Sequence, residues 1–309
     1  MDISFFIEIL KKGGIVAFPT ETVYGLGASA WDASAIKKVF EAKGRPADNP
    51  LIVHISSTDQ ILRFTNDVPE NAHKIMNAFW PGPITIIFKK KPEVLDSITA
   101  GLDTVAIRMP DHPLALALIE KTGPLVAPSA NTSGRPSPTK AEHVINDFGA
   151  DFPVIDGGST QLGLESTVID LTTSKPMILR PGSIGKTELE AVLHTSVWAD
   201  VNLRDKPRSP GQKYSHYKPK ASVRWLQSGE SPSQLNTLYL MIAKGTSTKN
   251  SVFYDGDLAS LARELYDQFR QADIHGFSDV VIEPFSHLSG LFPSLFSALM
   301  NRIEKAIGA

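Results

Sequence analysis

Apolar residues recur along the chain with two different periods, and the two periods alternate from one segment to the next. Apolar positions three or four residues apart predict a helix over 3–12, and the glycine pair at 13–14 ends it before the apolar run 15–18. The same alternation predicts further helices at 33–43, 69–79, 113–121 and 186–193, and strands at 51–55, 84–88, 105–109 and 125–127. This order is typical of an α/β fold.

The pattern changes between residues 150 and 180. Short apolar runs predict strands at 153–155, 166–171 and 177–179, and several of these follow one another without a helix between them. Consecutive strands without a helical crossover form hairpins, because parallel neighbours need a long connection. We therefore expect a mixed sheet rather than a doubly wound parallel sheet.

A second domain is predicted after a change of composition near residue 203. The segment LRDKPRSPGQKYSHYKPKA is rich in Pro, Lys and Arg and is expected to be a linker. Strands at 238–242 and 280–282 and helices at 258–270 and 294–306 then predict a small α/β unit. The expected organisation is a domain at 1–203, a linker at 204–221 and a second domain at 222–309.

Three aromatic residues stand in the predicted linker, Tyr214, His216 and Tyr217. A solvated spacer is the simpler interpretation, but aromatic side chains gain from burial. A linker that folds back over a binding site is the alternative.

Composition excludes several classes of protein. The chain has 309 residues, 42% of them hydrophobic, and carries 31 Lys and Arg against 33 Asp and Glu, a formal net charge of -2. A protein held to nucleic acid mainly by phosphate contacts would have a basic excess. The absence of cysteine excludes disulfides, thiolate catalysis and cysteine zinc sites. No apolar run approaches the ~18 residues of a membrane span, and the first residues lack the features of a signal peptide. We expect a cytoplasmic protein.

Two polar segments follow predicted elements in the first fifth of the chain. PTETVYGLG at 19–27 is either an ordinary polar turn after a strand or a substrate loop whose glycines let the backbone approach a ligand. It matches neither the P-loop nor the G-x-G-x-x-G pattern. Lys43 and Arg45 stand at a predicted helix end, where the helix dipole alone favours cations, but together they also suit a triphosphate.

Two more segments carry chemistry at predicted strand ends. Arg108 either points to solvent or, if it points inward, requires a partner such as a bound carboxylate. The run APSANTSGRPSPT at 127–139 follows a predicted strand, where α/β sheets bind ligands, and includes Ser129 and Asn131. Thr139 with Glu142 has the spacing of a helix capping box, which gives Thr139 a structural role.

Taken together, the segments of polar residues resemble the Sua5/YrdC family of threonylcarbamoyl-AMP synthases in its long Sua5 form. The resemblance rests on PTETVYGLG, KGRPADNPLIVHI, WPGPIT, RMPDHP, APSANTSGRPS, LESTVID, LRPGSI and SPGQKYSHYKPKA, in family order over residues 19–221. It implies a YrdC-like twisted mixed sheet flanked by helices around a basic cleft, followed by a small Rossmann-like C-terminal Sua5 domain.

The resemblance also implies an activity, its ligands and its site residues. The expected enzyme is a nucleotidyltransferase that makes threonylcarbamoyl-AMP from L-threonine, bicarbonate or CO₂, and ATP. Its product serves t6A modification at position 37 of ANN-decoding tRNAs. Threonine is expected at Thr22, His54, Arg108, Ser129 and Ser166. ATP is expected at Lys43, Arg45, Asn49, Thr104, Asn131, Thr139, Arg180 and Tyr217, with Lys43 and Arg45 also catalytic.

The same resemblance defines the expected cofactor and partners. Mg²⁺ is expected to arrive with the ATP phosphates, without metal ligands from the protein. A downstream tRNA threonylcarbamoyl transferase complex is the expected partner, with a weak contact to tRNA at most and no membrane contact. His54 is a weak candidate for a general base, since water or a substrate phosphate can also accept the proton.

Three other functions fit parts of the sequence. The first is an RNA-binding module, which the near-neutral charge disfavours. The second is a related enzyme with another carbamoyl-adenylate, like the YrdC-like module of hydrogenase-maturation proteins, which the missing cysteine motifs disfavour. The third is an inactive homologue, expected to lack the KGR or SAN motifs that are present here.

Overall fold

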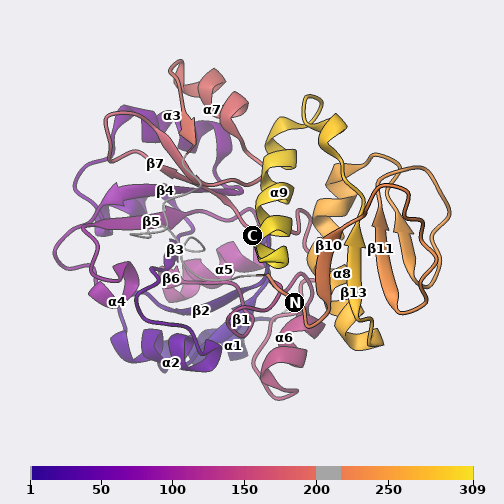
Figure 1. The fold of residues 1–309 in the computed structure, drawn as a ribbon. Helices are drawn as coiled ribbons and strands as arrows, with labels where there is room; N and C mark the ends of the chain where they lie inside the picture. The colour runs from indigo at the N-terminus through magenta and orange to yellow at the C-terminus, as the bar shows by residue number, and fades with distance from the viewer. Residues whose placement is uncertain (1, 200–216, 309) are drawn as a thin grey trace.

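The computed structural model describes residues 2–199 and 217–308, and their strands form two separate sheets (Figure 1). The first sheet has nine strands in the order β1-β2-β6-β3-β5-β4-β7-β8-β9, and the second has four in the order β10-β13-β11-β12. In the first sheet β3 and β5, β4 and β7, and β8 and β9 pair in parallel, while the other neighbours are antiparallel. The predicted mixed sheet is confirmed.

The N-terminal unit holds the nine-stranded sheet and its helices. The strands are β1 (Val16–Phe18), β2 (Gly25–Ser29), β3 (Ile52–His54), β4 (Ile84–Lys89), β5 (Thr104–Arg108), β6 (Leu125–Val126), β7 (Thr167–Asp170), β8 (Met177–Arg180) and β9 (Trp198–Ala199). The helices are α1 (Ser4–Lys11), α2 (Ala33–Lys43), α3 (Glu70–Phe79), α4 (Asp96–Thr99), α5 (Pro113–Thr122), α6 (Ala141–Phe148) and α7 (Lys186–Leu193), with a 3₁₀ turn at Thr58–Arg63.

Successive side chains along β3 and β5 point to opposite faces of this sheet, and the two faces have different surroundings. Val53 and Ile107 point into the large core that α2 and α3 cover. Ile52 and Ala106 point to the opposite face, where they pack with Val168. Because side chains two apart share a face, His54 and Arg108 lie on this second face. The helices α1 and α5 cover only its β1 end, through a cluster of their own.

The caps and the buried face of helix α2 determine where its basic C-terminal end lies. Asp32 caps its start by accepting from the backbone N–H groups of Ser34 and Ala35, and Gly44 ends it in the left-handed conformation with φ 58°. Ile36 and Val39 are fully buried on its inner face. The end of the helix therefore places Lys43, and Arg45 just after it, at the edge of the second face.

The C-terminal unit contains β10 (Ser222–Trp225), β11 (Thr237–Met241), β12 (Ser251–Phe253), β13 (Asp279–Ile282), α8 (Leu258–His275) and α9 (Pro293–Ile307). All of its strand pairs are parallel. Both helices pack on one face of this sheet, and α9 lies between the two sheets (Figure 1). The same hydrophobic cluster includes Val23 and Leu164 of the N-terminal unit, so the two units share a core.

Some predicted elements are wrong in detail. The strand expected at 153–155 is reduced to one bridge between Ala17 and Val154. The polar turn expected over 19–27 is shorter, because its last three residues pair with β1 and begin β2. The capping box of Thr139 does not form. Helix α6 begins at Ala141 without a side-chain cap, and the Thr139 N–H instead donates to the Nδ1 atom of His143, at 3.1 Å.

Other elements were absent from the prediction. Strands β2, β10 and β12 were not expected, and α8 continues five residues beyond the predicted end at 270, to His275. The two sheets fall on either side of the expected linker, but its residues 204–216, with Tyr214 and His216, lie outside the described residues. Within the described ranges, no helix is long and apolar enough to cross a bilayer.

Candidate active site

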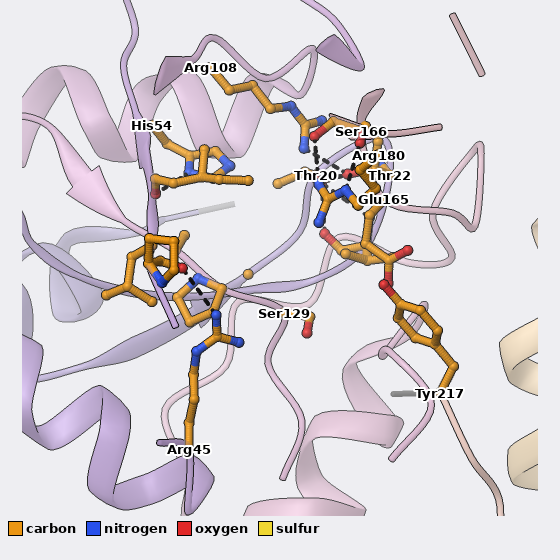
Figure 2. A pocket seen from close by; sticks show the side chains of 17 residues that line it. Thr20, Thr22, Arg45, His54, Arg108, Ser129, Glu165, Ser166, Arg180 and Tyr217 are labelled. Carbon is orange, nitrogen blue, oxygen red and sulfur yellow. Dashed lines mark hydrogen bonds between the residues drawn. The ribbon is translucent and has the colours of Figure 1, made fainter. Parts of the chain in front are cut away.

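A pocket opens on the second face of the large sheet, where β3, β5 and the turns before β2 and β7 meet (Figure 2). Its polar lining consists of Thr20, Thr22, Arg45, His54, Arg108, Ser129, Glu165, Ser166, Arg180 and Tyr217. All five residues expected to bind threonine line it, and so do three of the eight expected to bind ATP, namely Arg45, Arg180 and Tyr217.

Arg108 points inward, so the solvent-exposed interpretation is wrong. The side chain is 5% exposed and makes contacts in three directions. Its Nε donates to the Gly82 carbonyl at 3.2 Å, its Nη1 donates to the Thr22 hydroxyl at 2.9 Å, and its Nη2 pairs with the Glu21 carboxylate at 2.6 Å. These contacts fix the plane of the guanidinium group before any ligand arrives.

Glu21 was missed by the sequence analysis. It stands in the motif that supplied Thr22, but nothing in the local sequence indicates that it is buried against Arg108. The neighbouring turn is held by Thr20, whose hydroxyl donates to the Val23 carbonyl at 2.7 Å. The turn thus presents Thr22 to the pocket and Glu21 to the back of Arg108.

His54 is a buried, neutral residue of the same region. Burial, together with the positive charge of Arg108, lowers the pKa of His54 to about 3. Its Nδ1 lies 3.2 Å from the Ile52 carbonyl, to which only a protonated nitrogen can donate. In the neutral ring Nε2 is therefore a hydrogen-bond acceptor. A group with so low a pKa is a poor general base near neutral pH.

Arg45 and Arg180 both donate hydrogen bonds to neighbouring backbone carbonyls, and Arg180 also donates to a hydroxyl. The Arg45 Nη2 donates to the Pro50 carbonyl at 3.0 Å. The Arg180 Nε donates to the Ser166 carbonyl at 3.0 Å, and its Nη2 donates to the Ser166 hydroxyl at 3.1 Å. Tyr217, the first described residue of the expected linker, is buried at the pocket wall. Its ring stacks on Tyr266 of α8 at 5.3 Å between centroids.

Glu165 is a second carboxylate that the sequence analysis missed. It lines the pocket and accepts from the Ser137 hydroxyl at 2.6 Å, the Tyr266 hydroxyl at 3.0 Å and the Arg302 Nε at 2.9 Å. Burial acts to raise the pKa of Glu165, but the charges of Arg302 and Arg180 outweigh it and hold the pKa at about 2. The carboxylate is therefore ionised.

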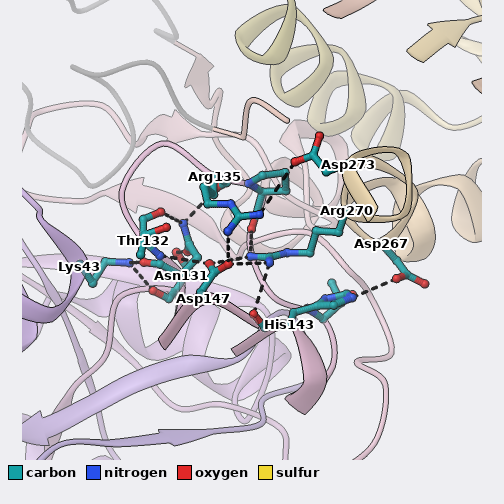
Figure 3. A network of polar contacts seen from close by, with 12 residues as sticks. Lys43, Asn131, Thr132, Arg135, His143, Asp147, Asp267, Arg270 and Asp273 are labelled. Atoms are coloured by element: carbon teal, nitrogen blue, oxygen red, sulfur yellow. Dashed lines mark hydrogen bonds and ion pairs between the residues drawn. The ribbon is translucent and has the colours of Figure 1, made fainter. Parts of the chain in front are cut away.

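The remaining predicted ATP residues lie outside this lining: Lys43, Asn49, Thr104, Asn131 and Thr139. Lys43 is buried, which lowers its pKa well below the usual value, and its ammonium group donates to the carbonyls of Ser129 and Asn131. It thereby holds the turn that carries Ser129 and Asn131, and Figure 3 shows Lys43 pointing towards Asn131. Thr104 begins β5, at the opposite end of that strand from Arg108. The ligand contacts of these five residues stay predictions.

The described residues contain no group of three His, Asp or Glu side chains placed to hold a metal ion. The one carboxylate in the pocket lining, Glu165, already accepts from three protein donors. The arrival of Mg²⁺ with ATP phosphates stays a prediction.

Three guanidinium groups and one carboxylate give the lining an excess of positive charge. Such a lining, at the strand ends of an α/β fold, is suited to small anionic ligands. Residues 8–182 match the Sua5/YciO/YrdC family model, described as telomere recombination, and residues 184–308 match the model of the threonylcarbamoyl-AMP synthase C-terminal domain. The chain belongs to the Sua5/YrdC family, in its long Sua5 form.

Similar proteins span the full chain or its first unit. A threonylcarbamoyl-AMP synthase of Bacillus subtilis is 45% identical, over 97% of this chain and 91% of its own. The crystal structure of Pyrococcus abyssi Sua5 complexed with L-threonine superposes with a TM-score of 0.88 at 39% identity, covering 99% of this chain and 94% of that one. A shorter threonylcarbamoyl-AMP synthase of Klebsiella pneumoniae is 33% identical over 55% of this chain and 90% of its own.

Proposed function

We propose that this protein makes threonylcarbamoyl-AMP from L-threonine, bicarbonate or CO₂, and ATP, releasing pyrophosphate. One observation carries the proposal. A single pocket combines the oriented guanidinium of Arg108 with the two further guanidinium groups of Arg45 and Arg180. An amino acid and a triphosphate both need such partners, and the reaction requires the two to be adjacent.

Threonine would bind at the Arg108 end of the pocket. The guanidinium would bind its carboxylate, and the Nε2 atom of His54 would accept from its amine or hydroxyl. The amine has a reference pKa of about 8 and must be neutral to attack CO₂. Nearby guanidinium charges disfavour the ammonium form, so the pocket would favour the reactive amine.

The carbamate oxygen would then attack the α-phosphorus of ATP. A phosphorus–oxygen bond forms to the carbamate while the bond to the β-phosphate oxygen breaks, and pyrophosphate leaves with the electron pair. Arg45, Arg180 and the Mg²⁺ bound to ATP would stabilise the charge on the phosphates. No covalent enzyme nucleophile is needed. A catalytic role for Lys43 would require its ammonium group to leave the carbonyls of Ser129 and Asn131.

The proposal extends to the cellular role. The enzyme would act in the cytoplasm as a nucleotidyltransferase and deliver threonylcarbamoyl-AMP to a tRNA threonylcarbamoyl transferase complex, for t6A at position 37 of ANN-decoding tRNAs. Its own contact with tRNA would be weak, because the net charge is -2.

Pyrophosphate release from Mg-ATP tests the proposal directly. We expect release only when L-threonine and bicarbonate are both present, and much less with glycine or serine in place of threonine. A folded preparation that binds ATP but releases no pyrophosphate under these conditions would contradict it. Salt-dependent RNA affinity would then be measured, since an RNA-binding module is the alternative.

A further inference from the structure

An arginine of the C-terminal unit pairs with a carboxylate of the pocket wall. Arg302, in α9, has a fully buried side chain. Its Nε donates to the Glu165 carboxylate at 2.9 Å and its Nη1 donates to the Pro181 carbonyl at 2.7 Å, contacts that join segments more than a hundred residues apart. Its guanidinium also lies 5.6 Å from the centroid of the Tyr217 ring. Glu165, Pro181 and Tyr217 all belong to the immediate surroundings of Arg180.

Two arginines interact electrostatically with the carboxylate of Glu165. The charges of both Arg302 and Arg180 act on its carboxylate, and Figure 2 shows Glu165 beside Arg180 on one wall of the pocket. Among the described residues, its ion pair is with Arg302, while Arg180 donates to the carbonyl and hydroxyl of Ser166. A buried carboxylate that lost Arg302 would be left without its main partner and would attract the nearest remaining cation.

We propose that Arg302 is a positioning residue of the nucleotide site, which holds the Glu165 carboxylate and so keeps Arg180 available to the phosphates of ATP. The inference rests on the function proposed above, because it takes Arg180 as a phosphate ligand. It assigns the C-terminal unit an indirect part in nucleotide binding, through the charge of Arg302 on Glu165. A merely structural role for Arg302 would predict only a loss of stability.

The charge argument makes opposite predictions for the two partners of the pair. Arg302→Met leaves Glu165 to pair with Arg180, so the Kd of Mg-ATP should rise about tenfold, the size of one lost charge-assisted contact. Glu165→Gln removes the competing charge, so the Kd of Mg-ATP should stay equal or fall. The double variant should bind Mg-ATP more tightly than Arg302→Met alone.

Calorimetric titration of Mg-ATP and of L-threonine into the full chain and these variants is the experiment. The threonine Kd, expected to change less than about threefold, reports that the pocket is intact. Lys305, on the same helix α9, also interacts electrostatically with Glu165 and is a second cation that this carboxylate would attract. Arg302→Met is therefore also tested in combination with Lys305→Met. Ser294→Ala is the matched control, because Ser294 lies on the same helix and contacts Glu188, at 2.7 Å, but not the pocket.

Weaker Mg-ATP binding in both single variants would overturn the inference, as would a double variant no better than Arg302→Met. Should Arg302→Met not fold, Glu165→Gln alone still decides, because weakened Mg-ATP binding in that variant contradicts the charge argument. A wild-type protein that binds no Mg-ATP would overturn the proposed function itself. If the wild-type protein binds Mg-ATP but the variants do not show the expected changes in Kd, only the inference is overturned.

Discussion

The two arginines at the centre of the pocket are held in different ways. Arg108 is fixed by Glu21, Thr22 and Gly82, all of them in the N-terminal unit. Arg180 is fixed by Ser166, but the carboxylate beside it is held by Arg302 and Tyr266 of the C-terminal unit.

The two halves of the pocket therefore differ in which unit of the protein holds their side chains in place. The half expected to bind threonine is built by one unit, and its guanidinium is oriented by a buried carboxylate of that unit. The half expected to bind ATP takes part of its wall, including Tyr217 on Tyr266, from contacts with the other unit. Each half should therefore respond to different substitutions.

The largest effect is expected on the threonine side. Arg108→Ala removes the carboxylate partner of threonine and leaves Glu21 buried without its cation, so threonine affinity should fall at least about 100-fold. The affinity for ATP should change much less. The KM values for both substrates, from pyrophosphate release, check this.

An arginine outside the pocket provides the control for Arg108. Arg63 is exposed and lies over the Trp31 ring, so Arg63→Ala should leave both KM values unchanged. Equal losses for threonine and ATP in Arg108→Ala would contradict the assignment of Arg108 to the threonine carboxylate.

The threonine half should also contribute to the acid sensitivity of the fold, because it contains His54. With a pKa of about 3 in the folded protein and about 6.5 in the unfolded chain, His54 binds fewer protons when folded between these pH values. The free energy of unfolding should therefore decrease as the pH falls from 6.5 towards 3, by up to about 1.4 kcal/mol per pH unit from this group. Urea unfolding at several pH values measures the slope.

Replacement of the histidine should flatten that slope. His54→Gln removes its contribution, whereas His275→Gln, at an exposed histidine, should keep the slope. Some acid sensitivity should persist, since burial also lowers the pKa of His143 and the charges of Arg302 and Arg180 lower that of Glu165. An unchanged slope in His54→Gln would show that His54 is not buried in its neutral form.

The smallest effect is expected at Tyr217, in the half supported by both units. Tyr217→Ala loses the stack on Tyr266 and part of the pocket wall, so the KM for ATP should rise about fivefold to tenfold. Tyr217→Phe keeps the ring and its stack on Tyr266, so its KM for ATP should rise less than that of Tyr217→Ala. A rise in the KM for threonine as large as that for ATP would place Tyr217 outside the nucleotide half.

The sequence predicted the longer elements of the fold better than the short ones. Periodicity located most of the helices and most of the inner strands, because their apolar faces are continuous, but it missed the inner strand β2. It also missed the three-residue edge strand β12, which offers too short a pattern, and it predicted a strand at 153–155, where only Val154 pairs with Ala17.

The chemistry of the pocket followed the same rule. Thr22, His54 and Arg108 stand in recognisable motifs, and each of them lines the pocket. Glu165 and Arg302 depend on each other across 137 residues, and no local pattern announces such a pair. The sequence predicts Lys43 as a phosphate-binding cation. Its burial and its two carbonyl partners arise from the tertiary structure, so the sequence does not indicate them.

Separate calorimetric titrations of L-threonine and Mg-ATP into Arg108→Ala and Arg180→Ala test the central claim, that one pocket holds both substrates in distinct halves. The account predicts a crossed result. Arg108→Ala should lose threonine binding and keep that of Mg-ATP, while Arg180→Ala should lose Mg-ATP binding and keep that of threonine. Equal weakening of both ligands in both variants would contradict it.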